Sequence, residues 1–169
     1  MTSAELLVDT FGRIRGDVQG AVGGLDPDQL VTRLDPDANT IAWLAWHLTR
    51  IQDDHIASAA QIDQVWTSGG WVERFGLPFE PLDTGYGHST DEVAACRVES
   101  GDLLLDYHDA VHAQTIRFVE GITDAELDRV VDESWDPPVT LGVRLVSVIN
   151  DNTEHAGQAA FVRGVVLRM

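Results

Sequence analysis

The segment Thr40–Ile56, TIAWLAWHLTRIQDDHI, constrains the fold of this chain more than any other stretch. Its apolar residues recur at the spacing of a buried helix, at Ile41, Leu44, Leu48, Ile51 and Ile56. Two histidines, His47 and His55, lie on or beside this apolar stripe, and Asp54 lies between them in phase. Because polar groups directed toward a core lose hydration, we expect these side chains to have polar partners or to bind a ligand.

The rest of the chain also has mainly helical periodicity. Serine, threonine or asparagine precedes each periodic segment, as expected of helix N-caps, and glycines follow several of them. No stretch shows a sustained strand-like alternation. We therefore predict an all-α fold, an antiparallel four-helix bundle that forms a single domain over residues 1–169. The four helices are expected at about residues 3–22, 40–64, 90–121 and from Thr140 to the last apolar run, with a short capped turn at 123–127.

A long connection separates the second and third predicted helices. Residues 65–89 read VWTSGGWVERFGLPFEPLDTGYGHS, rich in glycine and aromatic side chains and without regular periodicity. Long irregular loops in compact domains are commonly functional, and the aromatic content argues against disorder. We interpret this segment as an ordered flap that packs over one end of the bundle and forms the wall of a pocket; the alternative is a purely structural wrap.

Charge and cysteine content exclude several classes of function. The net charge is −17, from 28 acidic and 11 basic residues, and all the basic residues are arginine. Such a chain repels phosphate backbones and anionic lipids, so neither nucleic acid nor a membrane is expected as a partner. The absence of lysine excludes Schiff-base and P-loop chemistry. The single cysteine, Cys96, excludes an internal disulfide, and with no signal-like or membrane-spanning stretch we expect a cytoplasmic protein.

The last helix carries the other chemistry-bearing groups. In NDNTEHAGQ, Asp151 and His155 are four residues apart and therefore on one helix face. If this helix neighbours the one that carries His47, the three side chains can converge in the bundle interior. Two imidazoles and a carboxylate form a three-ligand site with open positions, compatible with a divalent zinc, nickel, iron or manganese ion.

Other interpretations of these polar residues remain open. His47 can equally be a core histidine paired with Asp151 or Asp54. His55 can be an alternative ligand or a hydrogen-bonded core residue, and Asp54 is the best candidate to orient a ligand imidazole. Four further groups have weaker claims: a metal site at His108 and His112, a surface or N-cap-region position for His88 with the pocket mouth as the alternative, solvated or orienting roles for Asp53 and Glu154, and contact of Arg50 or Arg163 with an anionic substrate group.

Three short motifs resemble the DinB-like superfamily of four-helix proteins: WLAWHL in the second helix, GYGHS before the third, and EHAGQ with a trailing arginine in the fourth. The superfamily includes S-transferases that use the thiols mycothiol or bacillithiol. The resemblance implies a metal held by one histidine of the W-H-L segment and two histidines four apart in the last helix. His47 and His155 match these positions, whereas Asp151 replaces the first histidine of the pair.

From the resemblance we expect a metal-dependent thiol S-transferase-like enzyme, with zinc or nickel as cofactor and a mycothiol-like low-molecular-weight thiol that is joined to an electrophilic small-molecule substrate. The alternative is a non-catalytic DinB-like binding or stress-response protein whose metal site is weakened or lost, because Asp151 departs from the motif. A homodimer is compatible with either function.

Overall fold

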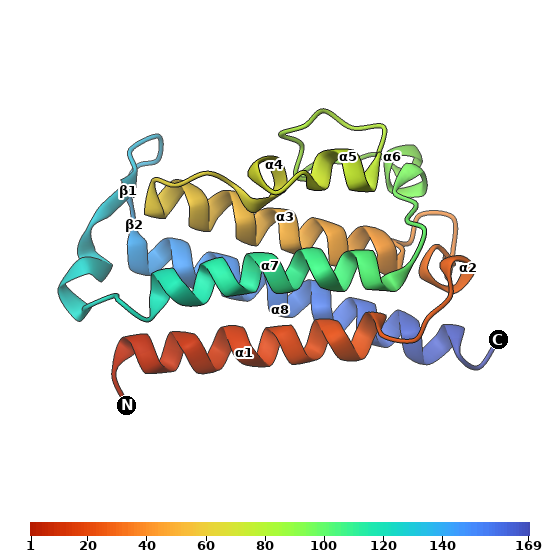
Figure 1. The fold of residues 1–169 in the computed structure, drawn as a ribbon, viewed down its shortest axis with the longest axis horizontal. Helices are drawn as coiled ribbons and strands as arrows, with labels where there is room; N and C mark the ends of the chain where they lie inside the picture. The colour runs from red at the N-terminus through yellow and green to blue at the C-terminus, as the bar shows by residue number, and fades with distance from the viewer.

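The computed structural model describes residues 1–169, and its framework is four long helices, α1 (Ser3–Val22), α3 (Ile41–Ala60), α7 (Gly101–Val119) and α8 (Leu141–Val166). Helices α1 and α3 lie diagonally opposite, and each packs against both α7 and α8 (Figure 1). The predicted all-α four-helix bundle is confirmed. Its helices are not all antiparallel, however, because α1 and α8 run in one direction and α3 and α7 in the other (Figure 1).

Each long helix begins after a hydroxyl side chain that accepts a backbone N–H of the first turn, namely Thr2, Thr40, Ser100 and Thr140. The predicted starts of the first, second and fourth helices are therefore confirmed to within a residue or two. Helix α3 ends earlier than predicted, because Gln61 adopts a left-handed conformation with φ of 56°. Such a residue terminates the helical hydrogen-bond ladder.

The prediction of one long helix over residues 90–121 is wrong. The structure has a short helix α6 (Thr90–Ala95) and then, after an irregular connection, α7. Ser89 and Ser100 each cap their own helix, so the chain has two competing start signals within the predicted element. Gly101 also packs closely on α1, where an added Cβ would lie 3.1 Å from Cγ1 of Val22. The apolar periodicity continues across the break because Cys96 and Val98 are buried there.

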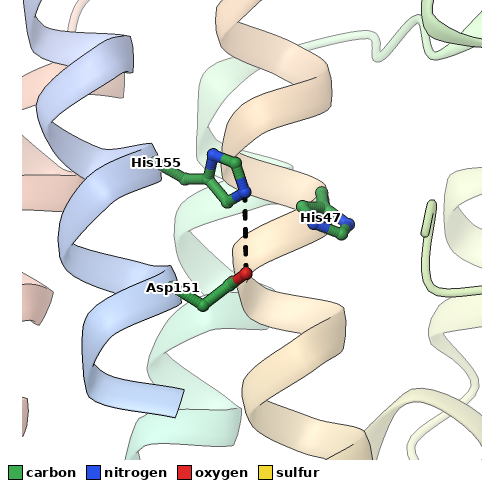
Figure 2. A group of neighbouring side chains, drawn as sticks. All are labelled: His47, Asp151 and His155. Carbon is green, nitrogen blue, oxygen red and sulfur yellow. Dashed lines mark ion pairs between the residues drawn. The ribbon is translucent and has the colours of Figure 1, made fainter. Parts of the chain in front are cut away.

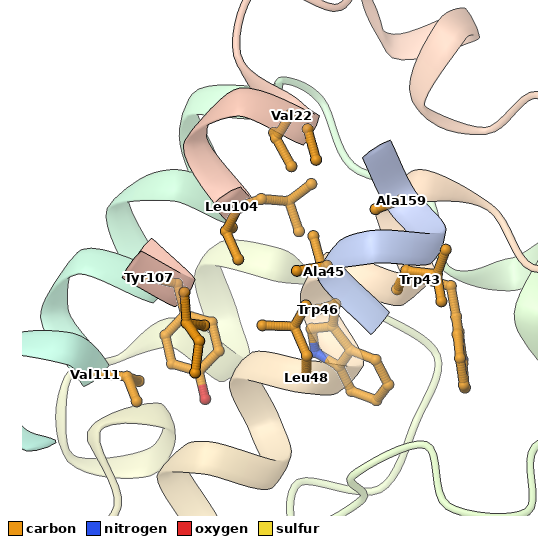
Figure 3. Close-up of a cluster of buried hydrophobic side chains, with 14 of the residues drawn as sticks. Val22, Trp43, Ala45, Trp46, Leu48, Leu104, Tyr107, Val111 and Ala159 are labelled. Carbon is orange, nitrogen blue, oxygen red and sulfur yellow. The ribbon is translucent and has the colours of Figure 1, made fainter. Parts of the chain in front are cut away.

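The core lies between the four helices and is centred on α3. Every residue from 41 to 53 is buried, which is unusual for a helix on the outside of a bundle. Figure 3 shows Trp46 and Leu48 of α3 packed beside Leu104 and Tyr107 of α7. Helix α3 is buried all round because the segment between it and α7 covers its outer side.

That covering segment, residues 61–100, returns the chain to the end at which α3 began, so that α7 runs parallel to α3 (Figure 1). It includes the predicted flap, which contains two short helices, α4 (Val65–Ser68) and α5 (Trp71–Phe75), rather than only irregular chain. Aromatic rings of both short helices pack against Tyr107.

Two charged residues of α3, Arg50 and Asp53, hold the covering segment against the helix. The carboxylate of Asp53 accepts the backbone N–H groups of Val65 and Trp66 at 2.8 and 2.7 Å. Arg50 donates from Nε to the carbonyl of Asp83 and is fully buried. The expectations that Asp53 is solvated or orients a ligand and that Arg50 meets a substrate are therefore wrong, because both side chains hold the flap in place.

Smaller elements complete the fold. Helix α2 (Pro27–Leu30) connects α1 to α3, and the predicted turn after α7 is a 3₁₀ helix, η1 (Asp124–Asp128). A small antiparallel hairpin follows, β1 (Val130–Asp132) with β2 (Val139–Thr140), in which Val130 pairs with Thr140. None of the helices combines the length and the apolar character needed to cross a bilayer.

Candidate metal centre

His47, Asp151 and His155 form one group, in which a potential ligand atom of each residue lies within 4.8 Å of the others. Figure 2 shows His47 on α3 facing Asp151 and His155, which follow one another on a single face of α8. Nε2 of His155 is 3.7 Å from Oδ1 of Asp151, and the two imidazole centroids are 5.0 Å apart. The antiparallel packing of α3 and α8 thus produces the predicted convergence.

The group lies at the edge of the core, not in the bundle interior as predicted. His47 is buried, but the side chains of Asp151 and His155 remain 31% and 18% exposed. The core positions of this part of α8 belong to the next residues along the chain, Asn152 and Ala156. Asp151 and His155 are therefore accessible to a small molecule from one side, while His47 lies beneath the surface.

Both imidazoles are oriented through Nδ1. The Nδ1 atom of His47 is 2.5 Å from the carbonyl oxygen of Thr84, and that of His155 is 2.9 Å from Oε1 of Gln158. These oxygens only accept hydrogen bonds, so Nδ1 is the protonated nitrogen in each ring and Nε2 keeps its lone pair. Metal-ligating histidines are generally held by such a bond from the other ring nitrogen. The ring of His47 is also stacked on Trp43, at a centroid distance of 4.6 Å.

The electrostatics of the group suit a cation. Burial lowers the pKa of His47 to about 4, which keeps its imidazole neutral at pH 7. Burial raises the pKa of Asp151, and its Oδ2 is buried with no hydrogen-bond partner. A divalent ion would supply the partner that this oxygen lacks, and two neutral imidazoles with one carboxylate are a usual ligand set for such an ion. The residues present therefore fit the metal that the sequence predicts.

A cavity of about 750 Å³ adjoins the group. Asp151 forms part of its wall, as does Thr84, whose carbonyl orients His47. From there the cavity extends between α3 and α8 toward the β hairpin. Its other chemically distinctive lining residues are Asp54, His55, Tyr86, Asp132, Trp135, Arg144 and Ser147.

Two more predicted residues line this cavity without contacting the group. The carboxylate of Asp54 accepts a hydrogen bond from Gln64 and lies 3.4 Å from Nδ1 of His55. It contacts neither His47 nor His155, so its predicted role in orienting a ligand imidazole is not seen. His55 is neither a core residue nor a member of the metal group, because its ring faces the cavity.

The remaining histidines serve the packing of the bundle. The side chain of His88 is only 4% exposed, so it is not on the surface, but it directly precedes Ser89, the N-cap of α6, which agrees with the expected N-cap region. It accepts a hydrogen bond from Trp43 and donates one to Asp83. His108 is buried and hydrogen-bonded to Thr49, and neither it nor His112 belongs to the metal group.

Sequence reasoning missed the groups that orient the ligands. A backbone carbonyl such as that of Thr84 carries no signal in the sequence, because every residue has one. Gly85 does carry a signal, since its φ is +86° and a Cβ there would lie 2.9 Å from Nδ1 of His47. Glycine is required at this position for its conformation and for its close approach to the ligand.

Two of three comparisons with known proteins found a match. The sequence model of the DinB superfamily matches residues 10–159. A crystal structure described as a conserved protein from Enterococcus faecalis is 31% identical, covers 100% of this chain and 99% of its own, and has a TM-score of 0.92. No curated protein matches.

Proposed function

The chain belongs to the DinB superfamily, and on that premise we propose that it is a metal-dependent enzyme that joins a low-molecular-weight thiol to an electrophilic small molecule. The observation that carries the proposal is the group formed by His47, Asp151 and His155 at one end of a cavity. The thiol proposed is mycothiol-like, as the resemblance to S-transferases of this superfamily implies.

The donor set favours zinc or nickel and leaves coordination positions free for a substrate. When bound, a divalent ion supplies Lewis acidity, which lowers the pKa of a coordinated thiol so that thiolate prevails near neutral pH. Neighbouring residues fix the orientation of the two imidazole rings. Trp43 and the Thr84 carbonyl hold the ring of His47, and Gln158 holds that of His155.

The competing function is a binding protein without turnover. The observation that favours it is Asp151, which stands where the resemblance implies a histidine and lies 3.7 Å from Nε2 of His155. These two residues can pair with each other without a metal through Oδ1 of Asp151, although its Oδ2 then still lacks a partner. The two functions differ in metal content and in turnover, so both can be measured.

The first test is metal analysis of protein purified without added metal. We expect about one ion per chain in the wild type, and little in His47→Ala or His155→Ala. His112→Ala is the matched control, since it removes a partly buried histidine outside the group and should keep its metal. Equal metal content in all four proteins, or none in any, would refute the metal site.

The second test is conjugation. Metal-loaded protein is incubated with mycothiol, bacillithiol or N-acetylcysteine and an electrophile such as monobromobimane, and the thioether is measured. Conjugation by the wild type and the His112→Ala control, lost in His47→Ala, supports the enzyme. Metal binding without conjugation of any of these thiols supports the binding protein instead.

A further inference from the structure

The cavity contains one ionisable pair outside the metal group, Asp54 and His55 on α3. Nδ1 of His55 is 3.4 Å from Oδ2 of Asp54, and both side chains are about one-third exposed, at 35% for the carboxylate and 29% for the imidazole. The contact is an ion-pair distance rather than a hydrogen bond, but the negative charge of the carboxylate favours a proton on Nδ1 and so leaves the lone pair on Nε2. An imidazole oriented in this way can take up a proton from a molecule in the cavity.

The other ionisable side chains of the cavity are less suited to accept a proton from a bound molecule. Arg144 is always protonated, and it donates to Asp132 at 2.7 Å. Asp132 also accepts hydrogen bonds from Ser134, and these contacts lower the pKa of its carboxyl. The carboxylate of Asp151 belongs to the metal group. His55 is therefore the free base of the cavity.

The charges around His55 leave it neutral at pH 7. Burial lowers its pKa, as does Arg144 on α8, while the carboxylates of Asp54, Asp151 and Asp132 oppose the change. His55 has no hydrogen bond or ion pair with His47, Asp151 or His155, and it lies two helical turns beyond His47 on α3. It is thus separate from the metal group but borders the same cavity.

We propose that His55 is the general base of the reaction, oriented by Asp54, and that it takes the thiol proton and returns it to the electrophile. This inference rests on the proposed function, because a thiol must bind for a proton to be transferred. His55 would be a catalytic residue, and Asp54 a positioning residue that acts through it.

The step balances for an epoxide as the electrophile. The S–H bond breaks, and its proton passes to Nε2 of His55. The sulfur then forms a bond to a ring carbon as the C–O bond of the epoxide breaks, and the electron pair of that bond remains on oxygen. The alkoxide takes the proton back from His55, so the net reaction adds the thiol across the ring without an oxidant or a reductant.

The first test measures the number of protons released when a thiol binds, not the amount of product formed. Binding of a thiol from the conjugation panel to the metal-loaded protein is measured by calorimetry at pH 7 in buffers of different ionisation enthalpy, which reports the number of protons released. Burial lowers the pKa of His55 in the free protein, but a thiolate beside the imidazole favours its charged form. If His55 holds the thiol proton against that thiolate, the wild type releases fewer protons at pH 7 than His55→Gln, which releases about one per thiol bound. Ser58→Ala is the matched control, because Ser58 lines the same cavity on α3 without an ionisable group, and it should behave like the wild type.

Kinetics give a second measurement. With an epoxide, His55→Gln should lower kcat about 100-fold or more, and imidazole added to His55→Ala should restore part of the rate. With an alkyl halide, whose leaving group needs no proton, the loss should be smaller. If a thiol binds but wild type and His55→Gln release equal numbers of protons, the role of His55 is refuted and the proposed function stands. If no thiol in the panel binds, both are refuted.

Discussion

Replacement of Gly85 by alanine tests whether the flap orients the metal ligand. The new Cβ would lie 2.9 Å from Nδ1 of His47 and 2.9 Å from a ring carbon of Trp46, so His47 must move. Its hydrogen bond to the Thr84 carbonyl would then lengthen or break. Loss of such an orienting contact lowers metal affinity by about 10- to 100-fold, which corresponds to about 1.4–2.7 kcal/mol.

Gly87→Ala is the control for backbone strain. Gly87 has φ of +78°, close to the +86° of Gly85, but a Cβ there would have no atom within 4 Å. Both variants should lose about 1–2 kcal/mol of folding free energy, because a left-handed alanine is strained. Only Gly85→Ala has the additional collision with His47.

The two losses can be measured separately. Urea denaturation of metal-free protein gives the folding term, and titration against a chromophoric chelator gives the metal affinity. We expect both variants to lose stability from the strain, Gly85→Ala more so because its Cβ also collides with the rings of His47 and Trp46. Metal binding should weaken in Gly85→Ala alone. If Gly85→Ala and Gly87→Ala bind metal equally tightly, the flap does not position His47.

Three further predictions concern other parts of the bundle. Asp53→Ala should lower the free energy of unfolding by about 3–5 kcal/mol in urea denaturation, because the buried guanidinium of Arg50 then lacks its carboxylate. The control Arg13→Ala removes one residue of an exposed ion pair and should leave the free energy of unfolding nearly unchanged. Equal losses in the two variants would contradict the role of Asp53 as an anchor of the flap. Burial lowers the pKa of His108 from 6.5 to about 4, so the unfolded chain binds more protons between these values. Stability from this group is complete above about pH 6.5 and should fall by about 1.4 kcal/mol per pH unit from there to about pH 4. Because the pKa of His47 is also lowered to about 4, His108→Gln should show a shallower decline in urea titrations, without the contribution of His108. Burial raises the pKa of the Cys96 thiol, so a thiol reagent should modify it only after unfolding, and rapid modification of the native protein would contradict its burial.

The sequence predicted the ligand group from two local rules together with the assumption that the two helices are neighbours, which the packing of α3 on α8 meets. The i, i+4 spacing of Asp151 and His155 places them on one face of any helix, and hydroxyl caps locate that helix and the one that carries His47. The structure places the group at the edge of the core rather than inside it, because the apolar periodicity of a sequence locates a helix face only to within about one residue. Asn152 therefore took the buried position expected for Asp151.

Tertiary contacts decided what the sequence could not. Arg50 and Asp53 look like solvated residues of an amphipathic helix, and they are buried only because the flap folds back over α3. At the break between α6 and α7 the sequence offers two caps, Ser89 and Ser100, and Gly101 packs closely on α1, a tertiary contact that the sequence does not reveal. His55 looked like a core residue or a spare ligand, and the cavity it faces is formed with distant parts of the chain, the flap and the β hairpin.

The rigid helix α8 also gives the cavity a length. Arg144 and Asp151 both line it and lie two turns apart on α8, about 10 Å along the helix axis. Neither the flap nor the hairpin can alter that spacing, because it is fixed by backbone hydrogen bonds within one helix. A molecule that contacts both Arg144 and Asp151 must therefore have a length that matches this spacing. Homologues that insert or delete a turn of this helix would bind molecules of a different length.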